Sequence, residues 1–432
     1  MTSPALARAA TTADSLRTAL VAELDKAVTL RHELHADAET SGSESRTAAR
    51  MAAALGDPDA PPVAGTGRII RIGGGDAPPV ALRAELDALP IVEQTAVPWA
   101  CRTGAMHACG HDVHMAALAA VGRAARTADA AGTLPVPLLA VLQPREEGVP
   151  SGARDVVASG ALAAHRPGAI IAVHLQPQLP AGTVAAAPGT VNAATDEFEI
   201  VVRGPGGHAG YPQLAADPVV ALCSAVVAIQ QIVSRRSDPT HAVVVSVGTL
   251  EAGHAPNVIP SSATARGTLR VLDQADRPAL HAALREVVTH ACLAAGCEAD
   301  VTIAEGEPAL VNDEALAAAT WPWLREAGFT VHTAFRSCGA DDFSYYTASA
   351  PALMLFLGTG GPVTLHSPEF LPDDDMVGQV ANAMLAGYLG ALSVLDAPAD
   401  EETRSGKGAA AMRERDSAPG RRAGKDDDQN GT

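Results

Sequence analysis

The sequence has few aromatic residues with which to build a core, and it has far fewer basic residues than acidic ones. Phe, Trp and Tyr make up 3% of its 432 residues, so a packed interior must come mainly from Ala, Val, Leu and Ile. Lys and Arg number 31 against 49 Asp and Glu, which gives a formal net charge of −18. Nucleic acids and anionic membranes bind to concentrated basic surfaces, so this charge argues against both as partners.

Long apolar runs are also missing. No stretch approaches the roughly 20 uninterrupted apolar residues of a membrane span. Asp14, Arg17 and Glu23 interrupt the N-terminal segment, which lacks the apolar core of a secretory signal and fits an amphipathic helix. The six cysteines are few and irregularly spaced, as is typical of thiols in a reducing compartment. We therefore expect a cytoplasmic protein.

The chain is long enough for two domains. Its outer parts alternate apolar strands with helices, a pattern typical of an α/β sheet covered on both faces. Its middle part follows the order strand, helix, strand, strand, helix, strand, which is the ferredoxin-like arrangement. Small and charged residues dominate the C-terminus, which is typical of disorder. The prediction is an α/β domain over 1–190 and 306–395, an inserted α+β domain over 191–305, and a disordered tail over 396–432.

The densest group of reactive side chains is MHACGHDVH, Met106–His114. Gly110 lets the backbone turn, so Cys109 and His111 can point at one centre, and both are good ligands for zinc and similar ions. The histidines could equally cap a helix that is predicted to start near Asp112, with the cysteine buried. A third interpretation makes Cys109 a nucleophile. The motif alone leaves all three open.

Other polar residues follow apolar strands. Glu146 and Glu147 come directly after VPLLAVLQP, His174 ends AIIAVHLQP, His366 follows PALMLFLGTGG, and Asp87 ends VALRAELD. Each of these residues alone is weak evidence for a functional site, because strand-end carboxylates are often merely solvated and a lone histidine is often structural. Since α/β sheets place their sites at the carboxyl ends of strands, the set together favours one shared site.

The chain resembles the M20 metallopeptidase family, and within it the amidohydrolases that include hippurate hydrolases and plant auxin-conjugate hydrolases. The resemblance covers about residues 15–395 and lies in these segments, in this order: LRAELDALP, MHACGHDVHMAAL, LQPREEG, HLQPQLPAGTV, GGHAGYPQLAADPVVA, APNVIP, ADDFSYY and LHSPEF. It implies a catalytic α/β domain interrupted by a smaller ferredoxin-like domain, which serves as a lid and forms a homodimer.

The resemblance also implies two bound divalent metal ions, with manganese or zinc as first candidates and cobalt or nickel as further ones. Their implied ligands are Cys109, His111, Glu147, His174 and His366. Cys109 would then hold metal as a thiolate, with a bridging position between the two ions as one option, and would not be a nucleophile.

The remaining implied roles surround that site. Glu146 would be the general base, and Asp87 the carboxylate that orients a metal ligand. In the inserted domain His208, Asn257 and Arg270 would contact the substrate, and His208 would reach across the dimer to the developing oxyanion. His107 and His114 are interpreted as supporting residues.

Two departures from the family pattern concern acids beside the implied ligands. Glu85 stands where the family usually has aspartate, and Asp341 stands where it usually has glutamate. The expected activity is metal-dependent hydrolysis of the amide bond of an N-acyl amino acid, either hippurate-like or N-acetylated. The alternatives are a dipeptidase or aminopeptidase of the same family, a metal-free amidase with Cys109 as nucleophile, and a non-catalytic relative.

Overall fold

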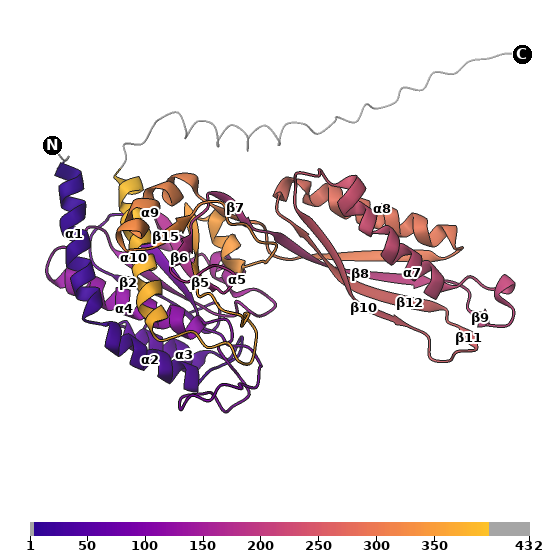
Figure 1. The fold of residues 1–432 in the computed structure, drawn as a ribbon, viewed down its shortest axis with the longest axis horizontal. Helices are drawn as coiled ribbons and strands as arrows, with labels where there is room; N and C mark the ends of the chain where they lie inside the picture. Colours follow the sequence, from indigo (N-terminus) through magenta and orange to yellow (C-terminus); the bar gives the residue numbers. More distant parts are fainter. Residues whose placement is uncertain (1–3, 397–432) are drawn as a thin grey trace, which may run out of the picture. The chain divides into compact units, whose positions relative to one another are not determined.

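A computed structural model describes residues 4–396, so all but the first residue of the predicted tail lies outside the described residues. Its largest sheet has eight strands, and the strands labelled β2, β5, β6 and β15 in Figure 1 belong to it. In spatial order they are β1 (Pro62–Val63), β2 (Gly67–Ile72), β4 (Leu138–Gln143), β3 (Val80–Glu85), β5 (Ala169–Gln176), β16 (Ala352–Gly358), β6 (Thr183–Ala185) and β15 (Thr330–His332). The four central strands β4, β3, β5 and β16 are parallel to one another, so their carboxyl ends lie along one edge.

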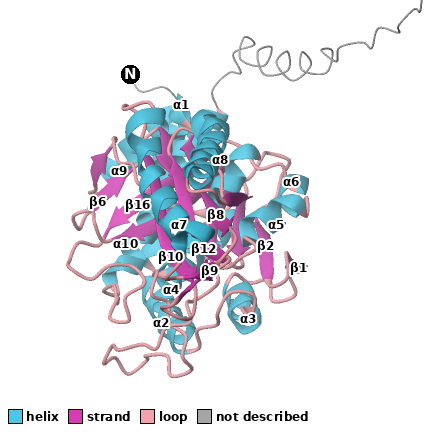
Figure 2. Ribbon diagram, turned by 90° about the vertical axis from the view of Figure 1, so that its right-hand side faces the viewer, coloured by secondary structure: helices cyan, strands magenta, loops and turns pink. Residues whose placement is uncertain are grey.

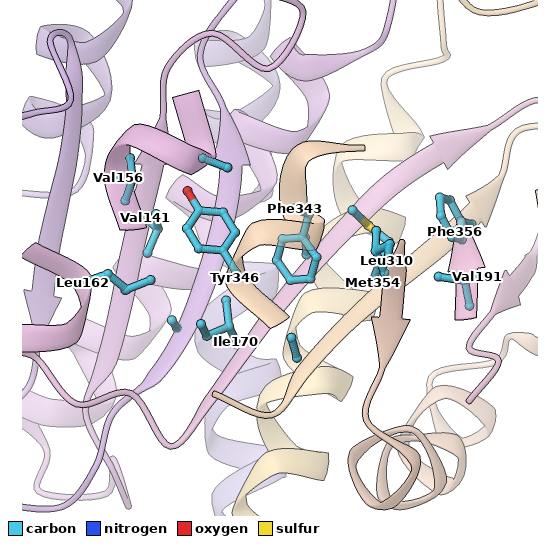
Figure 3. Packing of buried hydrophobic residues seen from close by; sticks show 14 of the residues in the cluster. Val141, Val156, Leu162, Ile170, Val191, Leu310, Phe343, Tyr346, Met354 and Phe356 are labelled. Carbon is cyan, nitrogen blue, oxygen red and sulfur yellow. The ribbon is translucent and has the colours of Figure 1, made fainter. Parts of the chain in front are cut away.

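Helices cover both faces of this sheet, as the alternating pattern predicts (Figure 2). One face packs against α5 (Gly152–Ala158), α6 (Ala161–Ala164) and the 3₁₀ helix η4 (Asp342–Ala348), where Tyr346 and Phe343 fill the interior (Figure 3). The other face packs against α4 (His111–Ala130) and α10 (Asp375–Leu395). The remaining helices are α1 (Pro4–Val21), α2 (Leu24–Ala36), α3 (Ser45–Ala54) and α9 (Glu314–Glu326).

Helix α10 sits unusually close to the sheet because of a glycine. A Cβ atom on Gly387 would lie 2.8 Å from Ile171 Cγ2, closer than packed carbon atoms tolerate. By length and composition α10 could cross a membrane, but 72% of its most apolar window is buried in the protein. It is therefore a core helix of this fold.

The middle of the chain forms a separate four-stranded antiparallel sheet, in the order β10 (Val243–Ala252), β12 (Ser262–Val271), β8 (Ala194–Arg203) and β13 (Glu298–Glu305). Helices α7 (Pro218–Ala228) and α8 (Arg277–Ala294) pack together on one face and share a hydrophobic cluster with it (Figure 1). This order and the antiparallel pairing are those of the ferredoxin-like arrangement, so that prediction is confirmed.

Some local predictions differ from the structure. The apolar segment DPVVALCSAVVAIQQIVS, residues 217–234, predicts a single helix, but α7 ends at Ala228 and a short π-helical turn, Ile232–Arg236, follows. Two short ribbons were not predicted, because strands of two to four residues leave almost no periodic signal. They are β7 (Gly189–Asn192) with β14 (Leu310–Asn312), and β9 (Gly207–His208) with β11 (Val258–Ile259).

Candidate active site

The candidate site lies at the carboxyl ends of the four parallel strands. Asp87 follows β3, Glu146 and Glu147 follow β4, His174 lies near the end of β5, and His366 lies in the loop after β16. These strands are neighbours in the sheet, so side chains that are far apart in the sequence come together at one edge.

The loop that carries the two glutamates is closed by its own backbone. Gly152 N donates to Arg145 O at 3.0 Å, and a Cβ atom on Gly152 would lie only 1.6 Å from Pro144 O. Glu147 N donates to Asp87 Oδ2 at 2.9 Å, which ties the loop to the end of β3. Position 152 therefore requires glycine, and the placement of both glutamates depends on it.

The implied metal ligands form two overlapping groups. In one, ligand atoms of Cys109, His111 and His174 lie within 4.8 Å of one another, and in the other so do those of Cys109, Glu147 and His366. Cys109 Sγ lies 3.5 Å from His174 Nε2, and His366 Nε2 lies 3.0 Å from Glu147 Oε1. Cys109 belongs to both groups, so it is placed to serve as a ligand in either.

Hydrogen bonds on one ring nitrogen fix how two of the imidazoles face this centre. His111 Nδ1 donates to the backbone carbonyl of Asp87 at 2.8 Å, and His174 Nδ1 donates to Leu175 O at 2.7 Å. Nε2 of each ring is therefore the nitrogen that faces the site, the arrangement seen in metal-binding histidines. The Asp87 carboxylate also accepts from Ser41 Oγ at 2.6 Å, which holds it in place.

Several observations indicate that these residues fit a pair of cations. Buried His111 Nε2 has no hydrogen-bond partner within residues 4–396. Although burial alone would lower it, Asp87 and nearby carboxylates raise the pKa of His111 to about 10, so the site holds a positive charge strongly. Burial and the charge of Glu147 raise the pKa of Cys109 well above its usual range. Its thiol stays protonated unless a cation sits beside it, which argues against a free thiolate nucleophile.

Glu146 lies inside the same centre with its carboxylate 3.7 Å from His111 Nε2. Burial and the charges of Asp341 and Glu147 raise its pKa well above its usual range. A carboxyl group that can hold a proton in this position is suited to taking one from a water molecule and returning it to a leaving group.

An arginine network behind the site was missed in the sequence. Arg83 in β3 is fully buried and donates to Gln143 Oε1 at 2.8 Å and to Asp342 Oδ1 at 2.9 Å. The Asp342 carboxylate also accepts from Ser151 Oγ at 2.7 Å and from Ala153 N at 3.1 Å. Asp342 therefore holds the end of the glutamate loop at Ser151 and Ala153. The sequence did contain a sign of this network, because VALRAEL places an arginine inside an otherwise apolar strand and a buried guanidinium needs acidic partners.

The other two histidines of the motif have different surroundings. His114 Nδ1 lies 3.0 Å from Glu85 Oε2, and His114 Nε2 accepts from Leu175 N at 3.2 Å, beside His174. His114 thus fixes the strand that carries a candidate ligand, and the longer side chain of Glu85 also pairs with Arg83. His107 is buried without a hydrogen-bond partner in the described chain, and burial lowers its pKa to about 3.

The residues expected to contact substrate do not all lie together. Arg270 in β12 donates to Cys338 O at 3.0 Å and lines the cavity at the candidate metal centre. His208 and Asn257 are exposed neighbours at the β9–β11 ribbon, where Ala209 N donates to Asn257 O at 3.1 Å, and neither lines that cavity.

The cavity at the candidate metal centre has a volume of about 340 Å³. Its lining includes Glu146 and four of the five metal-ligand candidates, which are Cys109, Glu147, His174 and His366. The other residues that line it are Gln176, Asn192, Arg270, Ser337, Gly339, Ala340, Asp341, Phe356 and Leu365.

The residues of this site lie within a region that matches a known protein family. The sequence model of peptidase family M20/M25/M40 matches residues 81–389, which include the four-stranded sheet and the part of the eight-stranded sheet from β3 onwards. The chain belongs to the M20 family. Its members hydrolyse amide bonds, so the protein is a hydrolase of this class.

Individual M20 relatives agree with the assignment. The chain is 34% identical over 359 residues to an N-acetylcysteine deacetylase of Bacillus subtilis, covering 81% of this chain and 92% of the relative. It is 34% identical over 324 residues to an N-acetyldiaminopimelate deacetylase of Shouchella clausii, covering 74% and 85%. Among solved structures it resembles a dinuclear metal binding M20 peptidase of Bacillus subtilis, with a TM-score of 0.74, 30% identity and coverage of 86% and 98%.

Proposed function

We propose that this protein is a metal-dependent amidohydrolase that cleaves the amide bond of N-acyl amino acids. The observation that carries the proposal is the position of Glu146, whose side chain is only 10% exposed and lies 3.7 Å from a ligand-type imidazole at the wall of a cavity. The relatives named as deacetylases of N-acetylcysteine and N-acetyldiaminopimelate support it, because both compounds are N-acyl amino acids.

The metal would be held by the five candidate ligands Cys109, His111, Glu147, His174 and His366. Thiolate, imidazole and carboxylate together suit several first-row ions, of which manganese and zinc are the first candidates and cobalt and nickel further ones. A metal pair held there would supply Lewis acidity, which would activate a water molecule and polarise a substrate carbonyl. Asp87 would keep the His111 ring oriented through the hydrogen bond at Nδ1.

Glu146 would move the proton. One of its carboxylate oxygens would take the proton of the attacking water, and the same group would then return that proton to the leaving nitrogen. The Arg83 and Asp342 network would hold the loop so that this carboxylate stays in reach.

Arg270 would bind the free carboxylate of the substrate, because a guanidinium presents paired donors that match a carboxylate. Arg270 lies at the cavity wall and donates one N–H to Cys338 O, so its remaining N–H groups are available to bind a substrate. Asn257 and His208 would assist from a second copy of the chain, since both are exposed on the β9–β11 ribbon.

We propose a homodimer formed through the inserted domain, which would act as the lid. Strand β10 is an edge strand of its sheet, and exposed apolar side chains occur on it and on the outer side of α7, including Leu250, Val220 and Val227. Dilution is expected to lower molecular mass and specific activity together, as light scattering and rate measurements can show. The Val227→Asp variant should be monomeric and weakly active. A fully active monomer would contradict the shared site.

The acyl group and leaving amino acid can be tested with a substrate panel. The protein is loaded with manganese or zinc, and release of free amine is measured from N-acetyl, N-benzoyl and N-indoleacetyl amino acids and from a dipeptide. We expect turnover of N-acyl amino acids and none of the dipeptide, whose free amino group does not match this class. Hydrolysis confined to the dipeptide would support the peptidase alternative.

The state of the cysteines bears on the compartment in which the protein works. All six cysteines are unpaired, as expected of a protein in a reducing compartment. We therefore propose that the enzyme works in the cytoplasm.

A further inference from the structure

One buried carboxamide in the cavity wall has no role in the chemistry described above. Asn192 is the last residue of β7, and only 5% of it is exposed. Its backbone is fixed by pairing with Leu310 of β14 and by a bridge to Ser337. Its side chain lines the cavity at the candidate metal centre, yet forms no hydrogen bond to any described residue, and Oδ1 is enclosed without a partner.

Strand β14, which pairs with β7, contains an asparagine with a purely structural role, and it serves as a comparison for Asn192. Asn312 of β14 is also buried, and all of its side-chain groups are used. Its Nδ2 donates to Ala187 O at 2.9 Å and Met354 O at 3.0 Å, while its Oδ1 accepts from Met354 N at 2.7 Å. Enclosing a carboxamide without such partners is destabilising, so the free groups of Asn192 point to a ligand.

The position of Asn192 indicates which part of a substrate it would meet. It bridges to Ser337, and Arg270 donates to the carbonyl of the next residue, Cys338. A substrate whose carboxylate is held by Arg270 would present the side chain on the same α-carbon to the wall that contains Asn192. On that side the wall also contains the Ser337 hydroxyl, which accepts from Gly339 N at 2.9 Å.

We propose that Asn192 binds a polar group on the amino-acid side chain of the substrate, so that the enzyme prefers N-acyl derivatives of short polar amino acids to their apolar isosteres. This inference rests on the proposed function. A carboxamide offers both N–H donors and a carbonyl acceptor, so a hydroxyl group, which donates and accepts, is a matched partner.

The test uses pairs of substrates with equal shape. N-acetyl-L-serine is compared with N-acetyl-L-2-aminobutyrate, and N-acetyl-L-homoserine with N-acetyl-L-norvaline. In the metal-loaded wild-type enzyme kcat/KM should favour the hydroxyl compound by about 10-fold or more in at least one pair, because the apolar analogue leaves the carboxamide unpaired. In Asn192→Leu, which keeps the volume and removes the polar atoms, the ratio should fall to about one.

Gln176→Leu is the matched control, because it removes the other carboxamide of the same wall and should keep the wild-type ratio. Metal content and melting temperature are measured for each variant, and Asn192→Ser replaces Asn192→Leu if that variant does not fold. Equal loss of kcat/KM for both members of a pair in the Asn192 variant would show a structural role and overturn the inference. So would a wild-type enzyme with no hydroxyl preference, or a ratio lost in Gln176→Leu alone.

Failure of the proposed function gives a different result. If the metal-loaded wild-type enzyme hydrolyses none of the four N-acetyl compounds, the assignment as an N-acyl amino acid hydrolase is wrong, and the specificity assigned to Asn192 falls with it. Hydrolysis of all four without discrimination leaves the function standing and removes only the inference about Asn192.

Discussion

Replacing Glu146 by glutamine is expected to lower kcat by roughly 100-fold to 10,000-fold, the usual contribution of a positioned general base. The amide keeps the size and most of the packing of the carboxyl group, but it cannot take a proton from water. Because the ligand set does not include Glu146, metal content measured by elemental analysis should stay at the wild-type level. The expected signature is therefore an enzyme that holds metal and binds substrate but does not turn over.

Two comparisons make this result specific. Glu298→Gln removes a carboxylate from the exposed surface of β13 and should leave kcat unchanged. Glu147→Gln should lower metal content as well as kcat, because that side chain lies among the ligand atoms. Retention of more than about a tenth of the activity in Glu146→Gln would be incompatible with a general base that contributes on the scale stated above.

Removing the metal should abolish activity. Exhaustive dialysis against a chelator is expected to lower kcat by at least about 1,000-fold, since Lewis acidity at such a centre contributes several kcal/mol to the transition state. Adding manganese, zinc or cobalt should restore it. The apo protein should also melt at a lower temperature, because it keeps several carboxylates close together without the cations that stabilise them.

The competing cysteine mechanism gives the opposite pattern. A metal-free amidase with a Cys109 nucleophile would survive chelation and lose activity on thiol alkylation. Full activity in protein shown by elemental analysis to be free of metal would refute the metal mechanism. We also expect alkylation to be slow in the holo protein, because Cys109 is only 5% exposed.

Much of this arrangement could be predicted from the sequence, for physical reasons. Strands such as VPLLAVLQP are apolar throughout because they are buried on both faces, and their ends carry polar side chains because the site lies there. The glutamate pair at 146 and 147 was therefore placed correctly at the sheet edge. The ferredoxin-like order was predictable because its strands and helices are long enough to show their periods.

Long-range partners could not be predicted from local patterns. Arg83 and Asp342 meet across 259 residues, and nothing near either one in the sequence specifies the other. The antiparallel direction of β2 and β6 within a mostly parallel sheet is likewise a property of the assembled sheet. Asn192 was overlooked because a single asparagine in a short strand carries no signal until the cavity beside it is known.

The closed loop at Gly152 limits how this active site can diversify. The candidate base and a candidate ligand are adjacent residues on one backbone ring, so their spacing is set covalently and neither can be repositioned alone. A change of substrate preference should therefore come from cavity-lining residues that lie outside this closed loop. Cavity-lining residues outside this loop, such as Asn192 and Ser337, can vary independently of it, so the hydrolytic chemistry should remain constant while substrate preference changes.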